Sequence, residues 1–479
     1  MAETHPPYLK LPNELWDLIF SYGFARKDFL VFSTINRVFN KAVEPSLYSS
    51  FTWIPDLSVW FPVASSLDNR DIRSYTRSRR RNRTGPPEGY FSQQKPYLFL
   101  RSILESPRRA GYVKEVKLLA PSSDVGIFWD SYQARECGLS IAQFETCKRT
   151  IEFLPSELHS YWLDGLYKGK LDVIMGILLL RLTGLTSIEI RLRDASTIGS
   201  TVFDALISPM ASRPHHYRYP HMKSVKVSID HMYGHPSRNV YELHREDFFS
   251  AYLQVPSFLE FKQLESLSVT YCSPGNFWRG KLSSALNLRK LALRNGLINE
   301  RILTTFLEST PHLEDLDCEL VYDNGAQQYL NCNTLKFALS LVQNTLKRLV
   351  LDIQVIYSPE WNPIPWDILN SMGSLKGFEK LRYLDIPMIL YATEINNASA
   401  AASLVPFAVR EVDYWGLVLP DALECFGIRP NGPDYHHRYE AERCVEVYFR
   451  MNPGVKRIFP GLDSGDDDDD DDLFGWVGV

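Results

Sequence analysis

The chain has 479 residues, of which 45% are hydrophobic and 23% charged, the balance of a globular rather than a disordered protein. Its formal net charge is -5, but eight aspartates at 463 and 466–472 account for more than this, so the rest of the chain carries +3. A nearly neutral body excludes any inference of a nucleic-acid or membrane partner from charge alone.

Hydropathy and cysteine usage predict a soluble protein of the cytoplasm and/or the nucleus. The longest apolar run, 173–180, lies between Asp172 and Arg181 and is too short to span a bilayer. Seven cysteines are scattered along the chain without a CxxC pair, and no signal peptide precedes them. This pattern predicts reduced thiols and no membrane partner.

The first 55 residues predict three short helices. One helix begins near Pro12 and carries Leu15, Leu18, Ile19 and Tyr22 on a single face. Asp28 can cap a second helix with Leu30, Phe32 and Ile35, and Asn36 can cap a third that Pro45 stops. Such a small unit cannot bury all this apolar surface by itself, so an exposed apolar face is expected to bind a partner.

Residues 56–110 are expected to form an Arg-rich linker or insertion. Seven arginines lie between positions 70 and 83, followed by Gly and Pro. A solvated linker, a nuclear-import signal and a nucleic-acid contact all remain open for this segment. The only interleaved aromatic residue is Tyr75, which argues against a platform on which bases stack.

Residues 111–460 repeat an apolar pattern of the form LxxLxL. It begins at 113, 185, 222, 264, 288, 313, 346, 381 and, more loosely, 409, and from 264 onward the starts are 24, 25, 33, 35 and 28 residues apart. A strand followed by a helix in every repeat predicts a curved solenoid of the leucine-rich-repeat type. Insertions are expected at 209–247 and 358–369, and an acidic disordered tail at 461–479.

The amino-terminal segment resembles the F-box, a three-helix motif. The resemblance covers residues 9–48 and rests on "LKLPNELWDLIFSY" followed by "DFLVFSTINRVFNKAVEPSLY". It implies that an adaptor of the Skp type covers the apolar face and links the chain to a cullin scaffold. The implied adaptor contacts are Leu11, Pro12, Leu15, Ile19 and Leu30.

The expected fold class is therefore α/β, with a small F-box followed by an irregular leucine-rich-repeat solenoid. An F-box followed by such repeats is a familiar family combination, and it implies the substrate-recognition subunit of an SCF-type ubiquitin ligase. Residues 11–48 could instead form a helical cap on the first repeat, because solenoids require capping. The polar insertion before residue 113 makes a direct cap less natural.

Catalytic chemistry is not expected. The chain contains no HExxH, GxSxG or GxxxxGK[ST] motif. Six histidines lie between 215 and 244, but their spacing matches no zinc pattern. The sequence therefore predicts no metal, no cofactor and no enzyme activity of the chain's own. A ligase receptor acts by proximity, because it raises the effective concentration of its substrate.

The substrate surface is expected on the face of the strands that alternates with the apolar positions. Asp315, Asp317 and Glu319 would repel one another on one strand unless nearby cations neutralise them. Either Lys290, Arg294 and Arg348 do so, or an acidic patch receives a basic substrate segment. The expected substrate-binding residues are Lys290, Arg294, Asp315, Asp317, Glu319, Arg348, Asp352, Tyr383 and Asp385.

Two other functions remain open. An F-box interaction scaffold would bind the adaptor without delivering substrates for ubiquitination. A nucleic-acid binder acting through the arginine segment is less well supported, and its binding would depend steeply on salt.

Overall fold

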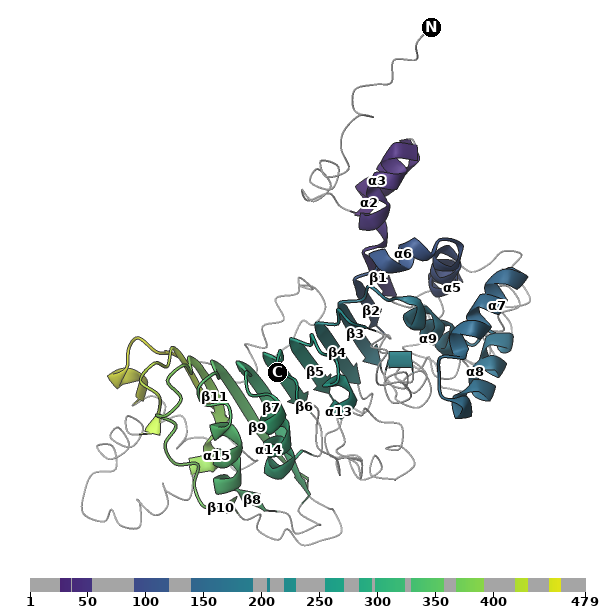
Figure 1. The fold of residues 1–479 in the computed structure, drawn as a ribbon. Helices are drawn as coiled ribbons and strands as arrows, with labels where there is room; N and C mark the ends of the chain where they lie inside the picture. The colour runs from purple at the N-terminus through teal and green to yellow at the C-terminus, as the bar shows by residue number, and fades with distance from the viewer. Residues whose placement is uncertain are drawn as a thin grey trace, which may run out of the picture. The chain divides into compact units, whose positions relative to one another are not determined.

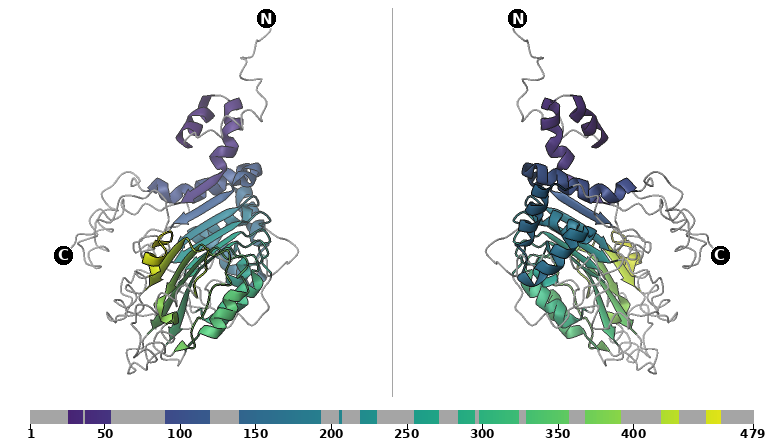
Figure 2. Two further views of the ribbon diagram at one scale, coloured as in Figure 1. Left: turned by 90° about the vertical axis from the view of Figure 1, so that its left-hand side faces the viewer. Right: turned by 90° about the vertical axis from the view of Figure 1, so that its right-hand side faces the viewer.

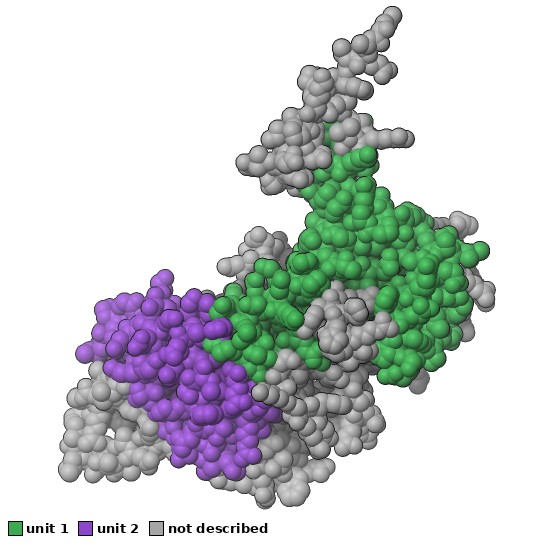
Figure 3. Space-filling model, in the orientation of Figure 1, with its two compact units in different colours: residues 1–298, 309–311 green, residues 299–308, 312–479 purple. Residues whose placement is uncertain are grey.

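The computed structural model describes part of the chain, in two compact units. Unit 1 comprises residues 1–298 and 309–311, and unit 2 comprises residues 299–308 and 312–479 (Figure 3). The described residues are 26–35, 37–53, 90–119, 139–192, 205–206, 219–229, 255–270, 284–294, 298–323, 329–356, 368–391, 418–429 and 448–457.

Unit 1 is a mixed α/β structure (Figure 1). Its helices are α2 (Arg26–Ile35), α3 (Arg37–Tyr48), α5 (Tyr90–Glu105), α6 (Pro107–Tyr112), α7 (Ile141–Ile151), α8 (Ser156–Lys168), α9 (Leu171–Arg181) and α13 (Val255–Phe258). Its strands are β1 (Ser50–Trp53), β2 (Glu115–Leu119), β3 (Ser187–Leu192), β4 (Ser224–Ile229), β5 (Ser266–Thr270) and β6 (Lys290–Arg294). These strands pair in chain order, and every pair is parallel.

Unit 2 also consists of helices and of parallel strands that pair in chain order. It contains helices α14 (Glu300–Ser309) and α15 (Cys332–Ser340) and a 3₁₀ turn, η6 (Met388–Tyr391). Strands β7 (Asp315–Asp323), β9 (Arg348–Ile356), β11 (Tyr383–Pro387), β12 (Cys425–Arg429) and β13 (Lys456–Arg457) pair in that order, all parallel. Short strands β8 (Leu330–Asn331) and β10 (Ile368–Leu369) form a separate parallel pair. The expected α/β class is therefore confirmed.

Helices cover one face of the strands in each unit. Figure 1 labels α9 beside the strands of unit 1, and α14 and α15 beside the strands of unit 2, and the side views show helices on one side of the strands (Figures 1 and 2). The apolar positions of the repeated pattern face the same interior: Leu267 and Val269 are buried on β5, while Ser266, Ser268 and Thr270 between them are partly exposed. Alternation along the strand thus separates a core face from an outward face.

Eight of the nine predicted repeat segments coincide with strands. In each, the strand begins two residues after the first apolar position, as Leu264 precedes β5 and Leu381 precedes β11. Before seven of these eight strands, one backbone carbonyl accepts two N–H groups from the next repeat; Thr186 O, for example, accepts from Lys223 at 2.7 Å and Ser224 at 3.1 Å. The segment that begins at 409 lies outside the described residues, as do the arginines at 70–83 and the tail at 461–479.

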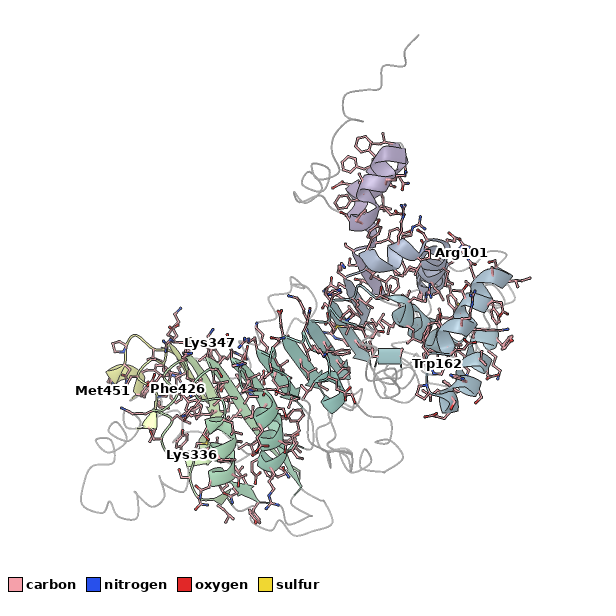
Figure 4. The ribbon with its side chains drawn as sticks, in the orientation of Figure 1. Arg101, Trp162, Lys336, Lys347, Phe426 and Met451 are labelled. Atoms are coloured by element: carbon pink, nitrogen blue, oxygen red, sulfur yellow. The ribbon has the colours of Figure 1, made fainter. Side chains whose placement is uncertain are left out.

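Two further repeats escape the sequence pattern because aromatic residues occupy apolar positions. Tyr48, Phe51 and Trp53 have this spacing at β1, and Leu423, Phe426 and Ile428 have it at β12. Both make the same carbonyl contacts, since Ser49 O and Arg382 O each accept two N–H groups from the neighbouring repeat. Phe426 packs against Tyr448 with ring centroids 5.2 Å apart (Figure 4).

The expected Arg-rich linker or insertion at 56–110 is folded in its last part. Helices α5 and α6 occupy 90–105 and 107–112. Leu100 and Ile103 of α5 are fully buried, and the Tyr97 hydroxyl donates to the Gly169 carbonyl at 2.9 Å. Composition alone did not reveal this, because burial of apolar side chains, and not charge, determines the structure of residues 90–112.

The expectation that Pro45 ends the third helix is also wrong. Helix α3 contains Pro45 and continues to Tyr48. A proline removes one hydrogen bond but need not end a helix that tertiary contacts hold. Here Glu44 bonds to Arg109 and the Tyr48 hydroxyl lies 2.6 Å from Ser102 Oγ.

A three-helix insertion follows β2. In α9 both ends of the apolar run and every residue between them are buried, so this helix has no polar face that periodicity could reveal. Trp162 of α8 is buried against it (Figure 4), and Gly176 lets the two helices approach because a Cβ at that position would collide with the Trp162 ring.

Candidate functional site

Register places the predicted unit 2 residues on one outward face. The first three outward positions of β7, β9, β11 and β12 form the β7–β12 face. Asp315 lies beside Arg348, which in turn lies beside Tyr383, and Glu319 lies beside Asp352. This face carries five carboxylates and two guanidinium groups: Asp315, Asp317, Glu319, Asp352, Asp385, Arg348 and Arg429.

Arg348 neutralises part of this charge, as one of the two alternatives predicted. Its Nη1 donates to Asp315 Oδ1 at 2.9 Å, and its guanidinium carbon lies 4.9 Å from the centre of the Tyr383 ring. Burial alone would lower the pKa of Arg348, but the hydrogen bond and charge of Asp315, with the charge of Asp317, raise it. Arg348 therefore remains a cation at any physiological pH.

Arg429 is a second cation that the sequence analysis did not identify. Its Nε and Nη2 donate to Asp385 Oδ2 at 2.9 and 2.6 Å, and its Nη1 donates to Asp352 Oδ2 at 3.0 Å. Burial would lower the pKa of Arg429, but these two carboxylates raise it above its ordinary value. The signal that could have found Arg429 is the L-x-x-F-x-I pattern that begins at Leu423.

The expected accessibility of Asp385 on this face needs correction. The side chain of Asp385 is only 3% exposed, and Val350 beside it is also buried. Arg429 contacts Asp385 directly, and Arg348 lies over the Tyr383 ring. Alternation along the strand therefore does not by itself ensure that an outward side chain is exposed. Asp385 is a buried ion-pair acid and not a freely accessible one.

Lys290 and Arg294 lie on the outward face of unit 1. They occupy the two ends of β6, and both are exposed. Their strand neighbour β5 presents Ser266 and Thr270 beside them. Within unit 1, these two cations therefore lie beside short hydroxyl side chains.

The helical segment exposes an apolar row beside its own small core. On α2, Leu30, Val31 and Ile35 are 57%, 62% and 55% exposed, whereas Phe29 and Val43 are buried between α2 and α3. Leu30 is thus accessible, as an adaptor contact requires. The other four implied adaptor residues, Leu11, Pro12, Leu15 and Ile19, lie outside the described residues.

A buried carboxylate holds this helical segment to the helices that follow. Glu44 of α3 has a side chain only 5% exposed, and it accepts hydrogen bonds from Arg108 and, at 2.8 Å, from Arg109 Nε. Arg109 also donates to Ser102 Oγ at 2.8 Å and lies over the Tyr48 ring. Helix α3 is therefore fixed to α5 and α6 by charge-assisted hydrogen bonds.

Replacing Glu44 with Ala is expected to destabilise unit 1 by about 3 kcal/mol, because it leaves Arg109 without its buried counter-charge. The matched control is Glu105→Ala, which breaks the exposed pair with Arg101 and should cost under about 0.5 kcal/mol. Urea unfolding of both variants measures the difference. Equal losses in the two variants would contradict the role assigned to Glu44.

The described cysteines are free thiols: Cys147, Cys318, Cys332 and Cys425. Burial raises the pKa of Cys147 to about 12, so this thiol is not a nucleophile at neutral pH. Among the described residues, no three His, Cys, Asp or Glu side chains gather in a way that could hold a metal ion. Within the same residues no helix is both long and apolar enough to cross a membrane.

The chain matches no protein-family model, and a search of the curated proteins finds no similar sequence. The function of the chain is therefore inferred from the geometry of the outward strand faces and of the α2 surface.

Proposed function

We propose that the chain is the substrate-recognition subunit of an SCF-type ubiquitin ligase. In this proposal α2 and α3 belong to an F-box that binds a Skp adaptor, and the parallel strands are leucine-rich repeats whose outward faces bind substrate. The observation that carries the proposal is the exposed apolar row of Leu30, Val31 and Ile35 on α2.

The cost of exposing this row supports the proposal. Three large apolar side chains more than half exposed on one short helix lose the stabilisation that burial would give, about 1.5 to 3 kcal/mol for each fully buried side chain. Phe29 and Val43 show that the same two helices do bury apolar residues where they pack. A surface of this kind indicates a protein partner, and the F-box resemblance of residues 9–48 names an adaptor as that partner.

The repeated strands support the second half of the proposal. Parallel neighbours in chain order, with the same carbonyl contacts at most strand entries, are what stacked strand–helix repeats produce. Their outward positions carry many charged and polar side chains, which can recognise a partner by charge complementarity. The Glu44 contacts hold α3 against α6, which favours a fixed position of the proposed adaptor-binding helices within unit 1.

The proposed complex places the chain in the cytoplasm, the nucleus or both, and assigns it no catalytic residue, metal or cofactor. The cullin and its associated enzymes supply the chemistry of ubiquitin transfer. The chain contributes proximity, because a bound substrate near a ubiquitin-charged enzyme has a high effective concentration.

Reconstitution tests the proposal directly. We expect the full chain, co-expressed with a Skp adaptor, a cullin and its RING partner, to purify as one complex. Adding the ubiquitin-activating and ubiquitin-conjugating enzymes should then modify proteins that the chain captures. Adaptor binding without the cullin would favour an interaction scaffold, and no adaptor binding would overturn both functions.

A further inference from the structure

A serine at the junction of α5 and α6 begins a short motif that occurs once in the chain. Ser or Thr precedes Pro at five positions, 106, 208, 273, 310 and 358, and only at 106 does a basic residue stand two places after the proline, in Ser106-Pro107-Arg108-Arg109. Proline-directed kinases of the cyclin-dependent class modify Ser or Thr before Pro and favour such a basic residue. The motif therefore makes Ser106 a candidate acceptor of phosphate.

The structure leaves the Ser106 side chain accessible. Ser106 is partly exposed, and Glu105, Pro107 and Arg108 around it are exposed. Ser106 precedes α6 in an extended conformation, with φ -138° and ψ 91°, and its hydroxyl makes no capping hydrogen bond to that helix. Thr310, the other Ser or Thr before Pro in the described ranges, is fully buried. Of these two residues, only Ser106 can be reached by a kinase.

Both arginines of the motif hold Glu44. Arg108 Nη2 donates to Glu44 Oε2, and Arg109 Nε donates to Glu44 Oε1 at 2.8 Å. The Glu44 side chain is 5% exposed, whereas that of Arg108 is 57% exposed. Because α3 packs against α6 (Figure 1), these two pairs join the helix that carries Glu44 to the helix that Ser106 precedes.

The Arg109 guanidinium also reaches the backbone next to Ser106. Arg109 Nη1 donates to the Ser102 carbonyl at 3.3 Å, and the Ser106 N–H donates to the same carbonyl at 3.2 Å. The Ser106 carbonyl in turn accepts from the Arg109 N–H at 2.9 Å. A phosphate on Ser106 would therefore lie close to the cations that neutralise Glu44.

We propose that Ser106 is phosphorylated by a proline-directed kinase and that the phosphate draws Arg108 away from Glu44. Ser106 Oγ forms a bond to the γ-phosphorus of ATP, the bond from that phosphorus to the β–γ bridging oxygen breaks, ADP leaves, and the hydroxyl proton passes to the kinase. The phosphate adds about -1.5 to -2 charges and three acceptor oxygens. Arg108 is the group it captures, because more than half of the Arg108 side chain is exposed and can turn toward Ser106.

The consequence is a looser attachment of α3. Glu44 keeps Arg109 but loses one charge-assisted hydrogen bond, and the added phosphate repels its carboxylate. Under the function proposed above, the modification releases the adaptor-binding helices from α6 and so regulates how the adaptor is held. This regulatory meaning rests on the proposed function, whereas the modification and its effect on α3 do not.

Phosphorylation of the full chain in vitro tests the site. The chain is incubated with magnesium ATP and a cyclin-dependent kinase bound to its cyclin, and phosphopeptides are mapped by mass spectrometry. We expect phosphate on Ser106 in the wild-type chain and none there in Pro107→Ala, which keeps the serine and removes the directing proline. An unmodified Ser106 in the folded wild-type chain, or equal modification of the Pro107 variant, would overturn the assignment.

Hydrogen exchange of α3 tests the effect of the phosphate. The α3 amides of the phosphorylated chain should exchange about tenfold faster than those of the unmodified chain, as expected when one charge-assisted hydrogen bond is lost. The control is the Ser106→Ala chain treated with the same kinase, which should exchange as the unmodified chain does because the Ser106 hydroxyl caps nothing. Unchanged or slower exchange in the phosphorylated chain would contradict the competition with Glu44.

The variant Arg108→Gln shows whether Arg108 is the captured group. It keeps Ser106, Pro107 and Arg109 and so retains the kinase motif, but Glu44 has already lost the Arg108 hydrogen bond. We expect faster α3 exchange before treatment and at most about a twofold further increase after phosphorylation, since the two changes remove the same contact. A full tenfold increase in this variant would overturn the capture of Arg108.

Adaptor binding separates this inference from the proposed function. A chain that binds the adaptor, but whose α3 exchange does not respond to the phosphate, contradicts this inference alone. A chain that responds to the phosphate as described, but never binds the adaptor, contradicts only the ligase function.

Discussion

A chain carrying Leu30→Asp and Ile35→Asp is expected to fold normally and to lose the Skp adaptor. Both side chains are more than half exposed, so the free chain should lose little stability. In the complex each would place a carboxylate in an apolar interface, where charge is costly. If each residue contributes about 2 kcal/mol, as an interface hot spot does, affinity falls about a thousandfold.

Co-purification and titration calorimetry measure this loss. The matched control is Ile141→Asp, which changes an equally apolar and even more exposed residue, at 86%, in the first turn of α7. An acid is favourable at that position of a helix, and α7 is not part of the proposed F-box. Wild-type adaptor affinity in the α2 double variant would remove the main support for the proposed function.

Replacing Arg429 with Leu is expected to destabilise unit 2 by about 3 kcal/mol. The substitution removes both donors of Asp385 Oδ2 and leaves the carboxylate of a side chain that is 3% exposed without its counter-charge. Removing one partner of a buried ion pair costs about 3 to 5 kcal/mol. The lower value applies because the Arg429 side chain is 25% exposed.

Hydrogen exchange of β11 and β12 reports this loss within unit 2. The double variant Asp385→Leu, Arg429→Leu should recover much of the stability, because it leaves no unpaired charge behind. Lys376→Ala is the control, since it breaks an exposed pair with Asp421 and should change protection little. Unaltered exchange in the Arg429 variant would show that the ion pair does not hold the two strands together.

The sequence by itself determined where most strands lie. Leu264, Leu267 and Val269, and their counterparts in seven other predicted repeats, are buried at the expected spacing. The reason is local: a half-buried strand must alternate apolar and polar residues, and the chain displays that alternation directly. The apolar positions of α2 also predicted a short helix with Leu30 on it, which the structure contains.

Other elements depend on contacts that the local sequence does not display. Helix α5 follows a segment rich in arginine and is held by burial of Leu100 and Ile103 and by the Tyr97 hydroxyl on Gly169, a residue 72 positions away. Helix α9 is apolar on all sides, so no periodicity marked it as a helix. Pro45 stays within α3 because tertiary contacts hold the helix on both sides of it.

The charge arrangement of the β7–β12 face was decided only by the tertiary structure. Asp315, Asp317 and Glu319 could be located on one strand from the sequence, and one of the two alternatives had Lys290, Arg294 and Arg348 neutralise them. The structure shows Arg348 paired with Asp315. Arg429, however, meets Asp385 and Asp352 across 44 and 77 residues of sequence. Burial along a strand is fixed by near neighbours in the chain, whereas an ion pair across strands exists only after the register of several repeats has brought its two charges together.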